Sequence, residues 1–274
     1  MARRKPELTS KIGWSTPDRI TVHGLDLPTE ILGEMNLGDL AFLLVKHRKP
    51  TPEESRMFNA VVITLVEHGI TPSAIVARMT YLGAPESLQA AVAAGLNGLG
   101  SVFVGSMEGA AKMLYDALPE DQVGTGVDLD ALAVKTVADY RARKQIVPGL
   151  GHPVHKPIDP RTPRLFELAA QNGFSGEYIA LMRSIGAEAE AKAGRPLAIN
   201  ATGALGAICC EMGFPWFITR GFGTMARAIG LVGHILEERE NPIAAELWLR
   251  TDEEILRNCG PDAAKAPDKA DHKG

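Results

Sequence analysis

The residues best suited to chemistry lie close together in one proline-rich segment, residues 149–161. Its sequence, GLGHPVHKPIDPR, contains two histidines, a lysine, an aspartate and an arginine among three prolines and two glycines. Prolines prevent a helix here and stiffen the backbone, so the segment is expected to hold its side chains in one geometry. Arg161 can bind a carboxylate through two parallel hydrogen bonds, and His152 can exchange or share a proton. The segment therefore predicts a site for a substrate with carboxylates and a carbonyl or hydroxyl group.

Most of the remaining chain predicts helices that are separated by glycine and proline. The strand pattern is convincing only at residues 19–23, before a glycine. Residues 51–54, Thr-Pro-Glu-Glu, have the pattern of a helix start, because a threonine cap is followed by proline and, three residues on, by glutamate. Helices are expected at residues 40–47, 52–68, 71–81, 85–100, 106–117, 128–144, 164–172, 177–193, 203–212 and 224–238.

Small residues recur inside the predicted helices, at 90–91, 93–95, 109–111 and 203–204. Alanine and glycine let two helices approach closely, although glycine lowers helix propensity. Aromatic residues make up only 5% of the chain, so the core must consist mainly of Ala, Leu, Ile and Val. These features predict tight packing in a large helical bundle.

Length and composition limit the classes of function. The chain has 274 residues, 45% of them hydrophobic, which is enough to bury a full core. A formal net charge of -4 gives no general attraction to nucleic acid or to acidic membranes. The three cysteines show neither a disulfide framework nor metal-ligand spacing, which fits the cytoplasm. The N-terminal region lacks an apolar segment and no long apolar run occurs, so neither a secretory signal nor a membrane span is expected.

Five short motifs occur in the order typical of one enzyme family. The segment 149–161 resembles the G-x-G-H-x-V…D-P-R segment of citrate synthases. The other four motifs are LVEHG at 65–69, GLNGL at 95–99, NATG at 200–203 and ARAIG at 226–230. The resemblance is strongest to short citryl-CoA lyases and to the C-terminal portion of ATP-citrate lyases. On these motifs the chain is identified as a member of the citrate synthase superfamily.

The resemblance also implies which residues bind the substrate and coenzyme A. His68 and His152 would hydrogen-bond the hydroxyl or carbonyl group and a carboxylate of a citrate- or oxaloacetate-like moiety. Arg161 and Arg227 would bind its carboxylates. Lys156 would lie near the phosphates of coenzyme A. The segment along its adenine would consist of Val147, Pro148, Gly149, Leu150 and Gly151. No metal is expected, because side chains would supply the cations.

The activity that the resemblance implies is cleavage of a carbon–carbon bond. Citryl-CoA or a related 3-hydroxyacyl-CoA would undergo a retro-Claisen reaction to acetyl-CoA and an oxo acid. A base removes the tertiary hydroxyl proton, the carbon–carbon bond breaks, and the thioester enolate that leaves is protonated. His152 is the candidate partner of the hydroxyl group, and cationic donors would stabilise the forming ketone. The expected partners are therefore a small acyl-CoA and an oxo acid.

Two positions depart from the pattern of citrate synthases. A histidine that follows a G-P-L motif there corresponds to Val104, which cannot bind the carbonyl of acetyl-CoA. This difference favours the lyase branch, which also tends to lack that histidine. The aspartate that moves a proton on the acetyl methyl carbon corresponds to Thr202, which is a poor base near neutral pH. Loss of a positioned acid–base group typically costs about 10²–10⁴ in rate.

Thr202, which stands at a catalytic position together with His68 and His152, leaves three interpretations open. The protein is a lyase for another 3-hydroxyacyl-CoA, with Glu67, His155 or a water in the missing role, or it is a slow citryl-CoA lyase. Alternatively it is a catalytically impaired CoA-thioester-binding or regulatory subunit of the same fold. An acyl-CoA lyase ranks first, the binding subunit second, and a helical scaffold without ligand last.

Some of these residues also have structural explanations. A histidine at a helix end, such as His68, is often a cap or a partner of the helix dipole. Arg227 lies among small and apolar residues, where a buried charge requires a partner, and a substrate carboxylate and Glu237 or Glu238 are both candidates. His234 lies in an apolar helix and is expected to be a satisfied core or interface residue.

The resemblance implies an all-α, citrate-synthase-type fold with two parts. The expected segments are an N-terminal arm, the fold itself and a disordered tail: residues 1–18, 19–256 and 257–274. The larger part would comprise about 19–106 and 208–256. The smaller part, about 107–207, would be mobile and would close over the thioester to exclude water. Family members build their sites at subunit contacts, so a homodimer or a larger even homo-oligomer is expected.

Overall fold

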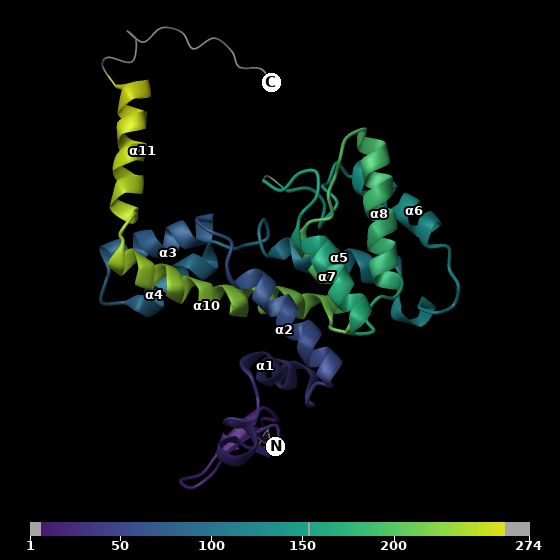
Figure 1. Ribbon diagram of the computed structural model, residues 1–274, viewed down its shortest axis with the longest axis horizontal. Helices are drawn as coiled ribbons and strands as arrows, with labels where there is room; N and C mark the ends of the chain where they lie inside the picture. Colours follow the sequence, from purple (N-terminus) through teal and green to yellow (C-terminus); the bar gives the residue numbers. More distant parts are fainter. Residues whose placement is uncertain (1–6, 153, 261–274) are drawn as a thin grey trace, which may run out of the picture. The chain divides into compact units, whose positions relative to one another are not determined.

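The structure is a computed structural model that describes residues 7–152 and 154–260. Contacts between residues divide the chain into two compact units. The first unit combines Met1–Val66 with Ser101–Ala226, and the second combines Glu67–Gly100 with Arg227–Gly274. Both units are mainly helical (Figure 1), so the predicted all-α class is confirmed. These boundaries differ from those of the predicted larger part (19–106 and 208–256) and smaller mobile part (107–207). That division stays a prediction.

The first unit begins with a small antiparallel sheet. The strands β1 (Gly13–Ser15), β2 (Ile20–Val22) and β3 (Leu25–Asp26) pair in this order, and a π-helix, η1 (Leu27–Ile31), follows. The predicted strand at residues 19–23 is confirmed as β2. β1 lies within the predicted N-terminal arm, of which residues 1–6 are outside the described part. Strands as short as β1 and β3 carry too few residues for an alternation pattern to be recognised.

Helices form the rest of the first unit, and local signals set where they begin. The backbone N–H of Thr51 donates to Glu54 Oε2 at 2.9 Å, and that of Glu54 donates to Thr51 Oγ1 at 3.2 Å. This reciprocal pair confirms the predicted capping box. The helices and short 3₁₀ turns are α1 (Leu37–Lys46), α2 (Pro52–Val66), α5 (Gly105–Ala117), η2 (Glu120–Gln122), α6 (Leu129–Ala142), α7 (Arg161–Gln171), α8 (Glu177–Ala193), α9 (Ala201–Glu211), η3 (Trp216–Ile218) and the first part of α10 (Thr219–Glu240).

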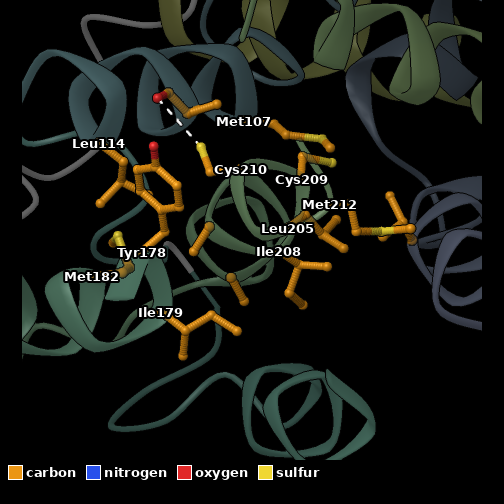
Figure 2. Packing of buried hydrophobic residues seen from close by; sticks show 14 of the residues in the cluster. Met107, Leu114, Tyr178, Ile179, Met182, Leu205, Ile208, Cys209, Cys210 and Met212 are labelled. Atoms are coloured by element: carbon orange, nitrogen blue, oxygen red, sulfur yellow. Dashed lines mark hydrogen bonds between the residues drawn. The ribbon is translucent and has the colours of Figure 1, made fainter. Parts of the chain in front are cut away.

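The core of the first unit surrounds α9. Figure 2 shows its buried side chains among those of α5 and α8: Leu205, Ile208, Cys209 and Cys210 on α9, and Met107, Leu114, Tyr178, Ile179 and Met182 on the neighbours. The Cys210 thiol donates to the Ala111 carbonyl oxygen at 3.6 Å. A Cβ on Gly206 would lie 2.9 Å from Ala110 Cβ, so only glycine lets α5 come this close. The predicted close packing through small residues is confirmed, and it fixes the helix whose first turn carries Thr202.

The second unit consists of α3 (Pro72–Gly83), α4 (Leu88–Asn97), the remainder of α10 and α11 (Ala244–Cys259). α3 packs against α4, where a Cβ on Gly95 would lie 2.9 Å from the Ser73 carbonyl oxygen. α11 is additional to the predicted helices and extends to Cys259, into the segment for which disorder is expected (Figure 1). Residues 261–274 of that segment lie outside the described part. Among the described helices, none is long and apolar enough to cross a membrane.

Candidate active site

The segment that begins at Gly149 is held against the start of α9 by hydrogen bonds. Gly151 N–H donates to the Ala198 carbonyl at 2.7 Å, and Asn200 N–H donates to the Gly149 carbonyl at 3.0 Å. The side-chain amide of Asn200 also donates to the Gly151 carbonyl at 2.7 Å. Gly149 has a φ of +82°, and a Cβ there would lie 2.5 Å from Gly203 Cα. Glycine alone fits this position, so the sequence G-L-G fixes the path of the chain into the histidine that follows.

The imidazole of His152 is oriented by its own loop. The backbone N–H groups of Val154 and His155 both donate to His152 Nδ1, at 3.1 and 3.0 Å. Two donors at Nδ1 require a lone pair there, so the neutral ring carries its proton on Nε2. The half-buried His155 ring stacks on it, with the ring centroids 4.4 Å apart. In its neutral form His152 is therefore a fixed hydrogen-bond donor at Nε2 and not a base at that atom.

Arg161 begins α7 and is held by the aspartate two residues before it. The buried Asp159 carboxylate accepts from Arg161 Nε at 3.0 Å and from Nη2 at 2.8 Å, and also from the backbone N–H groups of Arg161 and Ala201. Burial alone would raise the pKa of Asp159, but these hydrogen bonds outweigh it and lower the pKa to about 2. Asp159 takes one edge of the guanidinium, and the Nη1–Nη2 edge is the one that can bind a ligand carboxylate.

Thr202 lies in the first turn of α9, within a chain of hydroxyl groups. Its Oγ1 is 2.7 Å from Asn200 Oδ1, an atom that only accepts, so the Thr202 hydroxyl donates there. The Ser106 hydroxyl, 3.1 Å from Thr202 Oγ1, is then the donor of that pair, and Ser106 Oγ accepts from Gly149 N–H at 3.2 Å. The one proton of the Thr202 hydroxyl is thus used at the helix cap. A catalytic role for Thr202 stays a prediction.

The residues expected to contact coenzyme A lie in the same unit. Val147 and Pro148 are half-buried, whereas Lys156 is exposed, and these contacts stay predictions. Val104, at the position of the synthase histidine, is buried, and a Cβ added to Gly223 of α10 would collide with it. Val104 therefore belongs to the apolar packing between α5 and α10.

In the second unit, Glu67 organises the backbone around His68. Glu67 Oε1 accepts from His68 N–H at 2.9 Å and from Gly69 N–H at 2.6 Å. His234 Nε2 lies 3.0 Å from the same oxygen and 2.9 Å from Oε2. One carboxylate therefore fixes the turn that carries the exposed His68 and holds the buried His234.

Arg227 is the predicted carboxylate ligand of the second unit, and it is only 7% exposed. Its Nη1 lies 3.6 Å from Glu67 Oε2 and has no hydrogen-bond partner within the described residues. Burial lowers the pKa of Arg227, and the charge of Glu67 opposes this shift. The alternative that Glu237 or Glu238 neutralises Arg227 is wrong, because both carboxylates pair with Arg78. Arg227 thus keeps a buried donor that suits a ligand carboxylate.

Sequence patterns do not assign a holding role to several polar residues of the site: Asp159 and Asn200, which lie within recognised motifs, and Ser106, Arg78 and His234. Asp159 has a local signal, because an acid two residues before Arg161 can reach its guanidinium. Arg78 lies in a helix of small and apolar residues, which indicates a buried partner but does not identify it. The contact of Ser106 joins residues 96 apart in the chain, and no local pattern reports it.

Most of the chain also matches a family of known proteins. The family model described as "Citrate synthase, C-terminal domain" matches residues 29–248. The chain belongs to the citrate synthase family. This membership confirms the resemblance that five ordered motifs predict, and it places both the His152–Arg161 loop and Arg227 within the matched range.

Solved structures share the fold, and two lyases are among them. Citryl-CoA lyase from Hydrogenobacter thermophilus is 31% identical, with a TM-score of 0.74 over 84% of this chain and 86% of that chain. ATP citrate lyase from Methanosaeta concilii, solved as a D541A mutant with (3S)-citryl-CoA, is 22% identical, with a TM-score of 0.73 over 87% of this chain and 40% of that chain. The predicted citrate-synthase-type fold is therefore confirmed.

Curated relatives are longer than this chain. The probable ATP-citrate synthase of Dictyostelium discoideum is 24% identical in an alignment of 259 residues, which covers 87% of this chain and 39% of that protein. The citrate synthase of Heyndrickxia coagulans is 23% identical over 216 residues, which are 78% of this chain and 55% of that protein. The chain thus corresponds to between about two fifths and just over half of the relatives that it matches.

Proposed function

We propose that the protein is an acyl-CoA carbon–carbon lyase that cleaves citryl-CoA or a related 3-hydroxyacyl-CoA to acetyl-CoA and an oxo acid. The observation that carries the proposal is the loop from His152 to Arg161, which fixes an Nε2–H donor and a guanidinium edge in one segment. A tricarboxylate thioester needs a donor for its reacting oxygen and cations for its carboxylates. The likeness to a citryl-CoA lyase over 84% of the chain supports this conclusion.

Arg161 and Arg227 bind the substrate carboxylates in this proposal. Arg161 would use its Nη1–Nη2 edge, since Asp159 accepts from the other edge. Arg227 would use Nη1, whose burial without a hydrogen-bond partner among the described residues is unfavourable until a ligand oxygen arrives. Arg161→Lys removes the two-pronged contact and is expected to raise the KM for citryl-CoA about 10- to 100-fold.

The tautomer of His152 defines its part in the bond-breaking step. The tertiary hydroxyl loses its proton to a base, the bond from the carbinol carbon to the thioester CH₂ group breaks, and its electron pair forms the thioester enolate. His152 Nε2–H donates to the oxygen that becomes the carbonyl of the oxo acid, so it stabilises negative charge there. We assign the uptake of the hydroxyl proton to His68, which the family resemblance places at the same group.

The enolate must then take up a proton at carbon, and the family aspartate for this step is replaced by Thr202. We assign this role to His155, because its ring stacks on His152 and a ligand at His152 Nε2 would lie beside it. Glu67 suits the role less well, since its carboxylate already accepts hydrogen bonds from three N–H groups. His155→Phe keeps a stacked ring and is expected to slow turnover at least about 10²-fold.

Coenzyme A is the cofactor portion of the substrate in this proposal. Its adenine would lie along residues 147–151, with Lys156 near its phosphates. The hydrogen bonds of Gly149 and Gly151 to residues 198–200 fix that segment before the ligand binds, which lowers the entropy lost on binding. Lys156→Gln is expected to weaken coenzyme A binding, measured by calorimetry, without a change in kcat.

A catalytically impaired CoA-thioester-binding or regulatory subunit of the same fold is the second candidate. The observation that favours it is the hydroxyl of Thr202, whose one proton is donated to Asn200. A threonine in this arrangement does not serve as a base near neutral pH. The loop would then bind a thioester without cleaving it.

The test compares the purified protein with Thr202→Asp and with Thr202→Val on citryl-CoA, read as acetyl-CoA and oxaloacetate. Turnover by the parent supports the lyase, with another group moving the proton. If only Thr202→Asp turns over citryl-CoA, or if citryl-CoA binds but no protein cleaves it, the lyase proposal is wrong. The impaired binding subunit is then the better interpretation. Absence of both binding and turnover for citryl-CoA and for other 3-hydroxyacyl-CoAs would overturn both candidates.

We also propose that the protein forms a homodimer or a larger even homo-oligomer through α10. Ile229, Val232 and Leu236 are exposed at 45%, 49% and 56%, and their spacing places them on one face of the helix. A Cβ on Gly233 would have no atom within 4 Å, so a second helix can approach closely there. Light scattering of the parent and of Val232→Glu tests this, because the variant is expected to dissociate. A monomeric parent would contradict the proposal.

A further inference from the structure

We propose that Arg78 and His234 are positioning residues, which act through Glu67 on His68 and Arg227 and so set the substrate contacts of the second unit. The inference rests on the proposed function, because His68 and Arg227 are substrate contacts there. Arg78 and His234 themselves need not touch the substrate.

Arg78 is fully buried in α3 and donates to three side chains of α10. Its Nη1 donates to Glu238 Oε2 at 2.9 Å, and its Nη2 donates to Glu237 Oε2. Nε and Nη2 lie 3.3 and 2.9 Å from His234 Nδ1. A buried guanidinium is stable only when such partners replace water. The network therefore ties α3 to α10 at one defined position.

The contact with Arg78 selects the tautomer of His234. A guanidinium carries N–H donors only, so His234 Nδ1 must present a lone pair to it. The proton of the neutral ring is then on Nε2, which lies 3.0 Å from Glu67 Oε1. His234 accepts on one side and donates on the other, and so links a fixed cation to the carboxylate of Glu67.

Glu67 passes this constraint to the two predicted substrate contacts. Its Oε1 accepts from the backbone N–H groups of His68 and Gly69, and its Oε2 faces Arg227 Nη1 at 3.6 Å. This distance is too long for a hydrogen bond, so Nη1 is kept for a ligand. Without the donor from His234, the Glu67 carboxylate is free to rotate into a direct pair with Arg227. That rotation would release the backbone at His68 and would occupy the donor that the substrate needs.

The far end of the network is anchored to the backbone of α11. Glu238 accepts from the N–H groups of Ile243 at 3.1 Å and of Ala244 at 2.8 Å. Burial alone would raise the pKa of Glu238, but the hydrogen bonds from Ala244, Arg78 and Ile243 outweigh it and lower the pKa. Glu238 therefore stays ionised beside Arg78 and keeps the guanidinium in place.

The experiment compares two substitutions of His234 with a control on the same helix. His234→Gln keeps an acceptor for Arg78 and a donor for Glu67, whereas His234→Leu removes both. Arg239→Gln alters an exposed residue and serves as the control. We expect His234→Leu to lower kcat/KM for citryl-CoA by about 10²-fold, mainly through KM. His234→Gln should stay within a few-fold of the parent, and the Kd of coenzyme A should not change in any variant.

A folded His234→Leu with parental kcat/KM, or equal losses in both His234 variants, would overturn the inference. Histidine ¹⁵N spectra give a readout that needs no turnover. We expect His234 of the parent to be protonated at Nε2, and the His68 signals to shift in His234→Leu but not in Arg239→Gln. If the parent cleaves neither citryl-CoA nor another 3-hydroxyacyl-CoA, the proposed function fails by itself. Unchanged His68 signals would then still overturn the positioning role.

Discussion

In the first unit, the segment around His152 is held mainly by backbone hydrogen bonds and by a glycine that no other residue can replace. In the second unit, the carboxylate of Glu67 holds the backbone of His68, contacts His234 and faces Arg227. Both regions carry residues predicted to bind the same ligand. They differ in what fixes them: backbone hydrogen bonds around His152 in one, and contacts between charged and polar side chains in the other.

Because of this difference, different kinds of substitution should disrupt the two regions. A site held by backbone geometry is damaged by added atoms or by a changed φ, and much less by changes of salt or charge elsewhere. A site held by buried charges is damaged when one member is removed, because its partners are left unpaired away from water. Substitutions in the two regions should therefore have separable signatures, and the following predictions rank them by expected effect.

The largest effect is expected for Glu238→Gln. The substitution leaves the buried Arg78 without a charged partner at Nη1 and turns an amide N–H toward the donors of α11. Loss of one member of a buried pair costs about 3–5 kcal/mol, or roughly 10 °C in melting temperature. Glu237→Gln is the matched control, since Glu237 is 57% exposed and should change stability by about 1 kcal/mol or less. Equal melting temperatures for the two variants would show that the network does not stabilise the second unit.

The next effect is expected for Gly149→Ala. A left-handed backbone costs about 1–2 kcal/mol for alanine, and the clash with Gly203 adds about 1–3 kcal/mol. Gly151→Ala is the control, because Gly151 has a φ of +76° but no atom within 4 Å of an added Cβ. Thermal melting should therefore show the larger loss for Gly149→Ala. The same loss in both variants would mean that the contact with Gly203 contributes nothing.

A smaller effect, with a defined pH dependence, is expected for Asp159→Asn. The folded pKa of Asp159, about 2, lies below its ordinary value of 3.8, so its contribution is about 2 kcal/mol. This contribution is complete above about pH 4 and is lost as the pH falls toward about 2. The gap in melting temperature between parent and variant should be constant near neutral pH and should narrow below about pH 4. A gap that widens in acid would contradict the assigned ion pair with Arg161.

Local signals predicted much of the fold. The helix at residues 177–193 is found as α8 with the same bounds, and the capping box at Thr51 and Glu54 forms as its spacing indicates. Such features depend on residues a few positions apart, where periodicity and capping chemistry act directly. The sheet strands β1 and β3 escaped prediction because they are too short to show a period. α11 escaped it although its pattern is amphipathic, because no capping residue marks its start: the N-cap is Ile243, which makes no side-chain cap hydrogen bond.

The candidate site also has features that the sequence predicts and features that it does not. The loop from Gly149 to Arg161 could be picked out as a candidate site, because glycine, proline and charged residues occur within one short stretch. The partners of Arg78 could not be predicted, since Glu238 lies 160 residues further along the chain. The same holds for the tautomer of His152, which depends on where two backbone N–H groups point. Residue types report local geometry well, but they do not report which buried charges meet.

The measurement that tests the central claim most directly is cleavage of citryl-CoA by the parent, by His152→Ala and by His47→Ala. His47 is an exposed histidine of the first unit and controls for the loss of an imidazole. We predict release of acetyl-CoA by the parent and by His47→Ala, and a loss of about 10²–10³-fold in kcat for His152→Ala at an unchanged melting temperature. Parental turnover by a folded His152→Ala would contradict the assignment of the Nε2–H donor and, with it, of the site.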